Sequence, residues 1–420
     1  MKVACVGMSH LGIVTSLAFA SRNYDVVALD NDERIIQSLN EMKFPIYEPN
    51  INELARTLNK LPQYSTDFSL LEKCKIVYIT KDVPTNKSNE SELEELESLV
   101  RLVSNHISID SVLVLNSQVP PGFCRRLQDQ LHRELIYQVE TLVFGEAVNR
   151  ALHPERIVIG CKEDSSSIDN DFENFLMKSN CPILKMNYES AELTKLAINL
   201  TLAAQVTTTN ALAEICEEMG ADWLQIKEAL HLDSRIGPNA YLRPGLGLSG
   251  GNIERDISNI ISIASKNKTE YSIFESFFTN SNHRRNWIVK ILKENLNLST
   301  RTKVTIWGAT YKKATNSVKN SPSLYALREL SKYCNVSIFD PFINLFELEL
   351  NGAQIASDPF LSLVDSVALI ILSEDDFFQK REIRNYLTGQ SDLLVIDPLG
   401  VYRDLFEKRT LYFVLGKGSH

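Results

Sequence analysis

The sequence predicts an α/β protein with two parallel sheets and a long helical segment between them. Short apolar runs alternate with helix-like stretches at both ends of the 420-residue chain, which is the pattern of parallel strands connected by helices. The expected strands are residues 2–6, 25–29, 76–79, 112–115 and 157–160 in the first third, and 303–307, 335–339, 367–372 and 393–396 in the last. Residues 189–220 are instead helical and apolar on several faces, so we expect a helix there that is buried between domains or between subunits. We therefore predict three domains, at residues 1–185, 186–295 and 296–416.

The first strand leads into a glycine turn, Gly7-Met-Ser-His-Leu-Gly12, followed by a helix and by a second strand that ends in Asp30. Such a turn aims helix N-terminal amides at a pyrophosphate, and the acid binds ribose hydroxyls. This order predicts a Rossmann-like domain that binds NAD rather than NADP. The cofactor would contact Gly7, Ser9, His10, Leu11, Gly12 and Asp30. Ser9 replaces the usual middle glycine, so weaker binding, or an α/β domain whose turn binds nothing, remains an alternative.

Residues 235–256 form a glycine-rich segment between helical stretches, with Gly237, Gly245, Gly247, Gly250 and Gly251 interleaved with Arg, Tyr and Ile. Glycine allows the backbone to approach a ligand closely. A flexible linker is the alternative, but linkers of that kind are usually rich in Ser or Pro. Lys195 and Asn199 lie four residues apart on the preceding helix and so share a face, where they are candidates for holding a substrate oxygen.

The composition excludes several classes of protein. A net charge of −9 and a pI near 5.5 argue against nucleic-acid or anionic-membrane partners. No apolar run is long enough to span a bilayer. The seven cysteines are scattered, which favours reduced thiols in a cytoplasmic protein, and no cluster has metal-ligand spacing.

Five stretches, in order, resemble the UDP-glucose/GDP-mannose dehydrogenase family. They are Pro45-Ile-Tyr-Glu-Pro49, Ser117-Gln-Val-Pro-Pro-Gly122, the segment from Glu140 to Gly160, Ala191-Glu-Leu-Thr-Lys-Leu-Ala-Ile-Asn199 and the segment from Tyr311 to Pro322. The resemblance covers nearly the whole chain. It implies an N-terminal NAD domain, a central dimerisation helix and a C-terminal domain for the nucleotide end of a sugar substrate, in a homodimer.

The resemblance also implies the site residues. The catalytic set would be Lys195, Asn199, Asp256, Glu140 and the position of Asn252; further cofactor contacts would be Ser117, Gln118 and Lys319; the substrate would contact Arg235, Tyr241, Gly245, Gly247, Gly250 and Arg255. Family members oxidise a sugar C6 alcohol to a carboxylate in two hydride transfers through a cysteine thioester.

Three reacting positions depart from the family pattern. Asn252 stands where the family has its cysteine, Phe144 where it has the glutamate that activates the hydrolytic water, and Gln118 where it has a threonine. An amide is not the thiolate nucleophile that the thioester requires. Glu146 replaces the lost glutamate only if the local alignment shifts.

We therefore expect a two-electron, NAD-dependent oxidation of a nucleotide-sugar alcohol. Lys195 and Asn199 would stabilise the reacting oxygen, and Asp256 would orient Lys195 or a water that acts as base. The alternatives are a four-electron oxidation through an aldehyde hydrate and a catalytically silent nucleotide-sugar or NAD binder.

Overall fold

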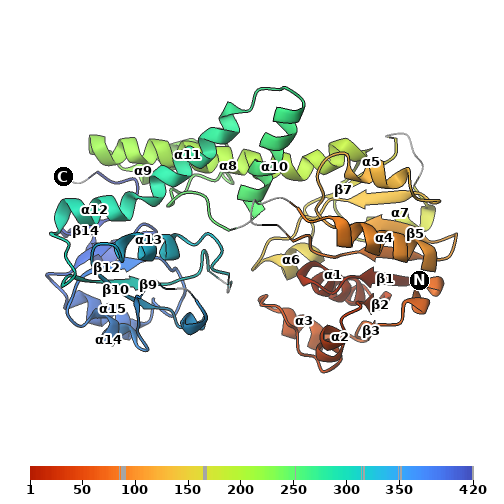
Figure 1. Ribbon diagram of the computed structural model, residues 1–420, viewed down its shortest axis with the longest axis horizontal. Coiled ribbons are helices and arrows are strands. Elements are labelled where there is room, and N and C mark those ends of the chain that lie inside the picture. Colours follow the sequence, from red (N-terminus) through yellow and green to blue (C-terminus); the bar gives the residue numbers. More distant parts are fainter. Residues whose placement is uncertain are drawn as a thin grey trace. The chain divides into compact units, whose positions relative to one another are not determined.

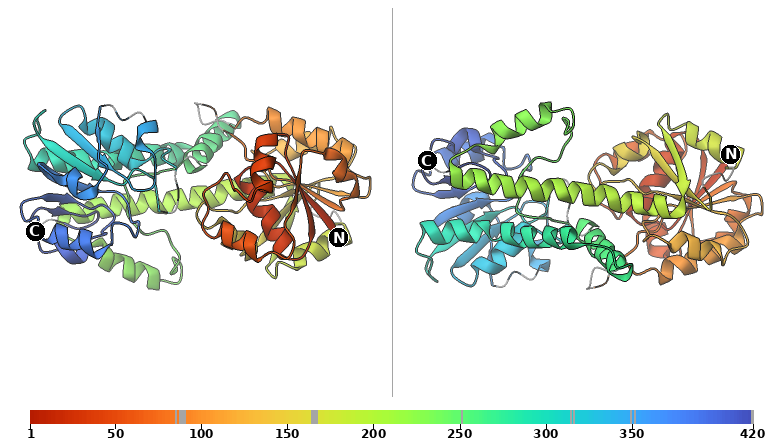
Figure 2. Two further views of the ribbon diagram at one scale, coloured as in Figure 1. Left: turned by 90° about the horizontal axis from the view of Figure 1, so that it is seen from below. Right: turned by 90° about the horizontal axis from the view of Figure 1, so that it is seen from above.

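A computed structural model describes residues 1–84, 86, 91–163, 168–250, 252–313, 315, 317–348, 350 and 352–418 (Figure 1). The chain divides into two compact units, Met1–Ile198 and Asn199–His420. The division falls inside helix α8 (Tyr188–Met219), which Figure 2 shows as one continuous helix and which confirms the long helix expected from the sequence. The three-domain boundaries stay a prediction.

The first unit contains an eight-stranded sheet in the order β3-β2-β1-β4-β5-β6-β7-β8. Its strands are β1 (Lys2–Val6), β2 (Asp25–Leu29), β3 (Gln63–Ser65), β4 (Ile76–Ile79), β5 (Val112–Leu115), β6 (Leu135–Gln138), β7 (Ile157–Cys161) and β8 (Ile183–Asn187). Its helices are α1 (His10–Ser21), α2 (Glu33–Asn40), α3 (Ile51–Thr57), α4 (Glu94–His106), α5 (Phe123–Gln128), α6 (Ala147–Leu152) and α7 (Asn170–Met177), with a 3-10 turn η1 (Phe68–Lys73).

An apolar core on each face of the sheet explains why most of these strands are nearly continuous apolar runs in the sequence. Side chains of α1, α6 and α7 cover one face of the sheet, and those of α4 and α5 cover the other. A strand covered on both faces has no polar side. Strands β1 and β4 are neighbours in the sheet, with β2 next to β1 and β5 next to β4. The turn after β1 therefore lies at the point where the connections between strands change direction. Ligands bind at this point in open α/β sheets.

The second unit contains a six-stranded, wholly parallel sheet in the order β11-β10-β9-β12-β13-β14. The strands are β9 (Lys303–Trp307), β10 (Asn335–Phe339), β11 (Gln354–Ile355), β12 (Ser366–Ile371), β13 (Leu394–Ile396) and β14 (Tyr412–Phe413). The helices are α9 (Trp223–Leu232), α10 (Asn252–Lys266), α11 (Ser272–Arg285), α12 (Trp287–Asn295), α13 (Pro322–Leu330), α14 (Pro359–Leu363), α15 (Arg381–Thr388) and α16 (Arg403–Phe406), with a 3-10 turn η2 (Leu345–Glu347).

The predicted α/β class with two sheets is confirmed, and the structure corrects three details. The first sheet is not wholly parallel, because β6 and β7 pair antiparallel. Helix α5 ends at Gln128, and a strand that the sequence did not predict, β6, begins at Leu135. Asn252 to Asp256 are not the end of a loop but the first turn of α10, an amphipathic helix whose buried face begins with this turn.

Candidate cofactor and substrate sites

The glycine turn after β1 requires its first and third glycines. Gly7 has φ +97°, and a Cβ there would lie 2.9 Å from Cβ of Lys81. A Cβ at Gly12 would lie 1.8 Å from the carbonyl oxygen of Gly7. These glycines therefore allow α1 to start directly above the end of β1, so that the first amides of the helix face the ligand position of a dinucleotide-binding turn.

Ser9 does not need to be a glycine in this turn. Its φ of −76° is available to any residue, so the side chain adds no backbone strain. The hydroxyl donates to the Thr80 carbonyl oxygen at 3.0 Å and accepts from the Asp82 N–H at 3.0 Å. The serine therefore ties the turn after β1 to the loop after β4.

Asp30 lies where the ribose-binding acid was predicted. Its Oδ2 accepts from the Met8 N–H at 2.6 Å, and its Oδ1 accepts from the Asp32 N–H at 3.0 Å. Gly7, Asp30 and Lys81 line a cavity of about 600 Å³ between the strand ends and α4. A carboxylate held by backbone amides at the edge of a cavity of this size fits the ribose end of a dinucleotide.

His10 contacts a buried acid that sequence reasoning did not single out as a site residue. Its Nε2 lies 3.0 Å from Oε2 of Glu48, whose side chain is 1% exposed. Glu48 also accepts from the amides of Gly145 and Ala147 at 2.9 and 2.7 Å. Burial alone would raise the pKa of the Glu48 carboxyl, but these hydrogen bonds outweigh it and lower the pKa below its usual value. Glu48 belongs to the motif Pro45–Pro49, which is the signal that pointed to it.

The loop after β5 presents an unsatisfied hydroxyl. Ser117 is fully buried, and its Oγ has no hydrogen-bond partner among the described residues. Buried polar groups are normally paired, so an unpaired hydroxyl at the carboxyl edge of the sheet fits a ligand contact there. Gln118 is half-buried in the same loop. Leu11, another predicted cofactor contact, is buried on α1.

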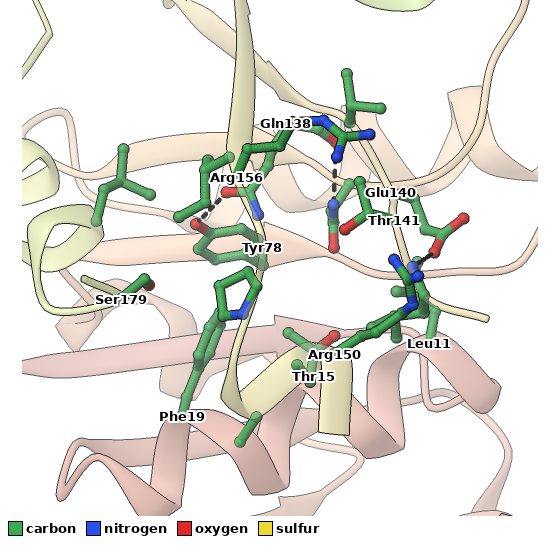
Figure 3. Close-up of a pocket in the computed structure, with 18 of the residues that line it drawn as sticks. Leu11, Thr15, Phe19, Tyr78, Gln138, Glu140, Thr141, Arg150, Arg156 and Ser179 are labelled. Carbon is green, nitrogen blue, oxygen red and sulfur yellow. Dashed lines mark hydrogen bonds between the residues drawn. The ribbon is translucent and has the colours of Figure 1, made fainter. Parts of the chain in front are cut away.

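Lys195 and Glu140, both in the predicted catalytic set, form an ion pair. Lys195 Nζ lies 3.2 Å from Glu140 Oε2, and the two side chains are 12% and 15% exposed. Glu140 also accepts from the Leu142 N–H. It lines a cavity of about 60 Å³, in which Figure 3 shows Glu140 and Arg150 at one end and Phe19 and Ser179 at the other. The ion pair fixes the Lys195 ammonium group in a position of low exposure, where the field of a charge is screened less than in water.

Phe144, at the position of the family's water-activating glutamate, packs on His10 with a ring-centroid separation of 4.7 Å. Its side chain is apolar, so it supplies no base. Glu146, the acid considered as a replacement, lies exposed at the start of α6.

In the second unit, the glycine segment is fixed to the surrounding helices. The Gly245 N–H donates to Asn210 Oδ1 of α8 at 2.7 Å. Gly247 has φ +84°, and a Cβ there would lie 2.6 Å from the Ser281 carbonyl oxygen. Gly250, with φ +80°, packs against the ring of Tyr311. Such anchoring disfavours the flexible-linker interpretation. Gly251 lies outside the described residues.

Three predicted ligand contacts are exposed. Arg235 pairs with Asp233 at 2.6 Å and has an 86% exposed side chain. Tyr241 is 55% exposed, and its N–H donates to Gln205. Lys319 is exposed in the loop before α13. Residues 314 and 316, in the motif that includes Lys319, lie outside the described residues.

Of the remaining predicted catalytic residues, Asn252 and Asp256 lie at the start of α10 and Asn199 lies on α8. Asp256 is completely buried; its Oδ2 accepts from Asn199 Nδ2 at 2.5 Å, and its Oδ1 pairs with Nε of Arg255 at 3.1 Å. The structure thus brings Asn199, Arg255 and Asp256 together. Asn252 is the exposed first residue of the same helix, so a carboxamide stands at the exposed end of this turn.

Glu254 is a further buried acid that the sequence did not reveal. It accepts from Arg285 Nη2 at 2.6 Å and from Asn320, which also donates to the Gly250 carbonyl oxygen at 3.2 Å. Burial raises the pKa of the Glu254 carboxyl, with Arg285 and Lys319 opposing the rise. Glu254 therefore connects α10 to α11 and to the loop that precedes α13.

No group of three metal-ligating side chains occurs within the described part of the chain. The seven cysteines are free thiols, and none of the described helices combines the length and apolar character needed to cross a membrane.

Together, the glycine turn, Asp30, the neighbouring cavity and the unpaired Ser117 hydroxyl define an NAD-binding α/β domain of the oxidoreductase class. Comparison with known proteins agrees. Residues 1–175 match the NAD binding domain of the UDP-glucose/GDP-mannose dehydrogenase family, residues 189–283 its central domain and residues 305–404 its UDP binding domain. The chain belongs to this family of NAD-dependent nucleotide-sugar dehydrogenases.

Individual relatives are similar over almost the full length. A UDP-glucose 6-dehydrogenase of Bacillus subtilis is 27% identical over 416 residues, which cover 96% of this chain and 89% of that protein. A UDP-glucose 6-dehydrogenase of Rickettsia bellii is 28% identical, with 94% of each chain covered. A solved UDP-glucose dehydrogenase from Pyrobaculum islandicum superposes with a TM-score of 0.83 at 24% identity and covers 98% of this chain and 96% of its own. That likeness supports the fold.

Proposed function

We propose that this protein oxidises one alcohol of a nucleotide sugar by a single two-electron step with NAD as the acceptor. The observation that carries the proposal is Asn252, an amide at the nucleophile position. Arg255 and Asp256, three and four residues further along α10, are buried, and Asp256 pairs with Arg255 and with Asn199 of α8. A carboxamide cannot form a thiohemiacetal, so no thioester intermediate is available.

The chain's own residues would bind the reacting oxygen and move its proton. Lys195, oriented by Glu140, supplies positive charge, and Asn199, oriented by Asp256, supplies an amide donor. Fixed donors of this kind stabilise an alkoxide or carbonyl oxygen because they need no reorganisation during the reaction. When bound, NAD supplies hydride acceptance; the turn from Gly7 to Gly12 would hold its pyrophosphate and Asp30 its ribose.

The test is product stoichiometry. Purified protein is incubated with NAD and a panel of nucleotide sugars, and NADH is compared with the product identified by mass spectrometry. One NADH per sugar with an aldehyde or ketone product is expected. Two NADH per sugar with a carboxylate product would refute the two-electron proposal and favour the aldehyde-hydrate route. The mutation Lys195→Ala should abolish turnover while leaving NAD affinity largely intact.

A catalytically silent binder is the second candidate, favoured by the apolar Phe144 and the amide of Asn252 at two reacting positions. Calorimetric binding of NAD and a nucleotide sugar, without turnover across the panel, would support it.

A homodimer remains part of the proposal. Leu212, Ile215 and Met219 lie on α8 at spacings of three and four residues, and 41%, 51% and 77% of their surfaces are exposed. Apolar residues exposed in a row along a helix are typical of a protein interface. Light scattering with size-exclusion chromatography should give a dimer mass. A cytoplasmic location stays a prediction.

A further inference from the structure

The sheet of the second unit repeats the strand order of the first. Strands β3-β2-β1-β4-β5-β6 of the first sheet and β11-β10-β9-β12-β13-β14 of the second follow the same order, and every neighbouring pair among them is parallel. Strand β9 therefore corresponds to β1, β10 to β2, β11 to β3 and β12 to β4. The turn after β9 lies where the connections between strands change direction, and ligands bind at such points in open α/β sheets.

The turn after β9 also repeats the hydrogen bonds of the turn after β1. Gly308, with φ +92°, corresponds to Gly7, with φ +97°. Asp340, directly after β10, corresponds to Asp30. Its Oδ2 accepts from the N–H of the residue after the glycine at 2.8 Å, and its Oδ1 accepts from the N–H two residues beyond the acid at 2.9 Å. Asp30 accepts from the same two positions. Asp340 is therefore held as a ribose-binding acid is held, and each of its carboxylate oxygens keeps a second lone pair for a ligand.

Asp340 lines a cavity of about 450 Å³ at the carboxyl ends of β10 and β11. The loops after β10, β11 and β12 contribute to its wall, and these loops correspond to the ones that line the cavity beside Asp30. Phe339, Phe346 and Phe377 also line it, and 81% of the Phe346 surface is exposed. A concave, mainly apolar cavity with a few fixed polar groups is the usual form of a small-molecule site, and nucleobases stack on aromatic rings.

Two differences from the first unit decide which ligand the cavity would take. Helix α1 begins at His10, directly after the glycine turn, whereas the chain after Gly308 forms a loop and α13 begins only at Pro322. The helix start that faces a pyrophosphate in the first unit therefore has no counterpart directly after Gly308. Asp358, the N-cap of α14, brings a second acid into the cavity wall. Two acids repel a phosphate, so the cavity favours a ligand with a ribose and a base but no phosphate.

We propose that the second unit contains a nucleoside-binding pocket, in which Asp340 accepts hydrogen bonds from the 2′ and 3′ hydroxyls of a ribose and Phe346 stacks on the base. The residues predicted to contact the nucleotide sugar, all of them within the described ranges, are not among those that line this pocket. The pocket is therefore an addition to the substrate site, and it does not depend on the oxidation proposed above.

The test is calorimetric titration of adenosine into the full-length Asp30→Asn variant, in which the ribose-binding acid of the first unit is removed. Saturable binding of one adenosine per chain is expected. The further change Asp340→Asn should weaken this binding about tenfold, because hydrogen bonds to a charged acceptor are lost. Asp392→Asn is the matched control: it removes one exposed acid just before β13, at the amino edge of the same sheet, and should leave the dissociation constant unchanged.

The ligand supplies a second readout. 2′,3′-Dideoxyadenosine lacks both hydroxyls, so it should bind about tenfold more weakly than adenosine, and Asp340→Asn should weaken it no further. An Asp340→Asn change that weakens both ligands equally would act through structure and overturn the role of Asp340. UDP should not displace adenosine, since the pocket repels phosphate. Displacement by UDP would place adenosine in the nucleotide-sugar site and overturn the proposal.

Phe346→Ala keeps the test decisive if Asp340→Asn does not fold. Because Phe346 is exposed, this variant should keep the wild-type Tm and bind adenosine about fivefold more weakly through the loss of base stacking. Leu361→Ala, which removes a 64% exposed apolar side chain of α14 outside the cavity wall, is its control. Unchanged adenosine affinity of Phe346→Ala, or no saturable binding by the Asp30→Asn variant, overturns the proposal. The NADH stoichiometry is measured separately, so failure of this pocket is distinguishable from failure of the proposed oxidation.

Discussion

Substituting Gly12 by alanine should separate α1 from the turn after β1. A Cβ at this position would lie 1.8 Å from the Gly7 carbonyl oxygen and 2.9 Å from Oγ1 of Thr80. Ordinary contact begins at 3.4 Å, so the helix and the Gly7 peptide must move apart by about 1.6 Å. The closest atom belongs to the backbone, and rotation of a side chain cannot relieve the overlap.

Two opposing effects determine how much Gly12→Ala changes the free energy of unfolding. Overpacking in a close-packed region costs about 1–3 kcal/mol or more, and a backbone clash belongs at the upper end. Replacing glycine by alanine inside a helix stabilises the helix by about 1 kcal/mol. We expect a net loss of about 2 kcal/mol, equivalent to a Tm lower by about 4–8 °C for a domain of this size.

Scanning calorimetry and NAD titration measure the two consequences. The displaced helix start should also weaken NAD binding more than tenfold, since its amides no longer point at the pyrophosphate. Gly389→Ala is the control: Gly389 has φ −77°, and the nearest atom to an added Cβ is 3.5 Å away. A Gly12→Ala variant with wild-type Tm and NAD affinity would refute the packing argument.

Three further changes test the other parts of the site. Asn252→Cys should introduce a thiol-dependent second oxidation, seen as more than one NADH per sugar and sensitivity to iodoacetamide; an unchanged stoichiometry would show that the nucleophile alone is insufficient. Asp256→Asn leaves Arg255 buried beside a neutral group and should lower stability by about 3–5 kcal/mol, measured by urea unfolding; a loss below 1 kcal/mol would contradict the buried pairing. Glu48→Gln should lower the free energy of unfolding by about 1–3 kcal/mol at pH 7. Because the folded-state pKa of Glu48 is lowered, this loss of stability should be present above the unfolded pKa of about 4.5 and disappear as the pH falls through the folded pKa. A loss that grows on acidification would contradict the lowered pKa.

Much of the fold could be predicted from the sequence because the central strands have a local pattern of apolar residues. The strands of both sheets that lie in the middle of the order are buried on both faces, so their sequences are apolar runs bounded by turn residues. The edge strands β3, β11 and β14 have two or three residues each, too few for a periodic signal, and sequence reasoning missed them. β6 and β8 were missed as well, since each follows closely on a helix and is only partly distinguishable from it by pattern.

The candidate site was predictable where a residue type is tied to a motif. Gly7, Gly12 and Asp30 stand where a dinucleotide-binding turn requires them. The pairing of Asp256 with Asn199 was not predicted, since Asp256 was expected to orient Lys195 or a water, and Lys195 instead pairs with Glu140. The partners of Glu48 and Glu254 were not predictable, because each acid contacts groups from segments distant in the sequence. A single acid has no periodic signature, and whether it is exposed or buried depends on chain segments that only folding brings together.

The sequence by itself determined the α/β class, the glycine turn and the absence of a cysteine nucleophile at Asn252, because propensity, period and residue identity are local properties. The tertiary structure alone decided that Glu254 is buried against Arg285, that Ser117 keeps an unpaired hydroxyl, and that Asn252 begins a helix rather than ending a loop. These are matters of burial and of hydrogen-bond partners, and both arise from contacts between residues far apart in the chain.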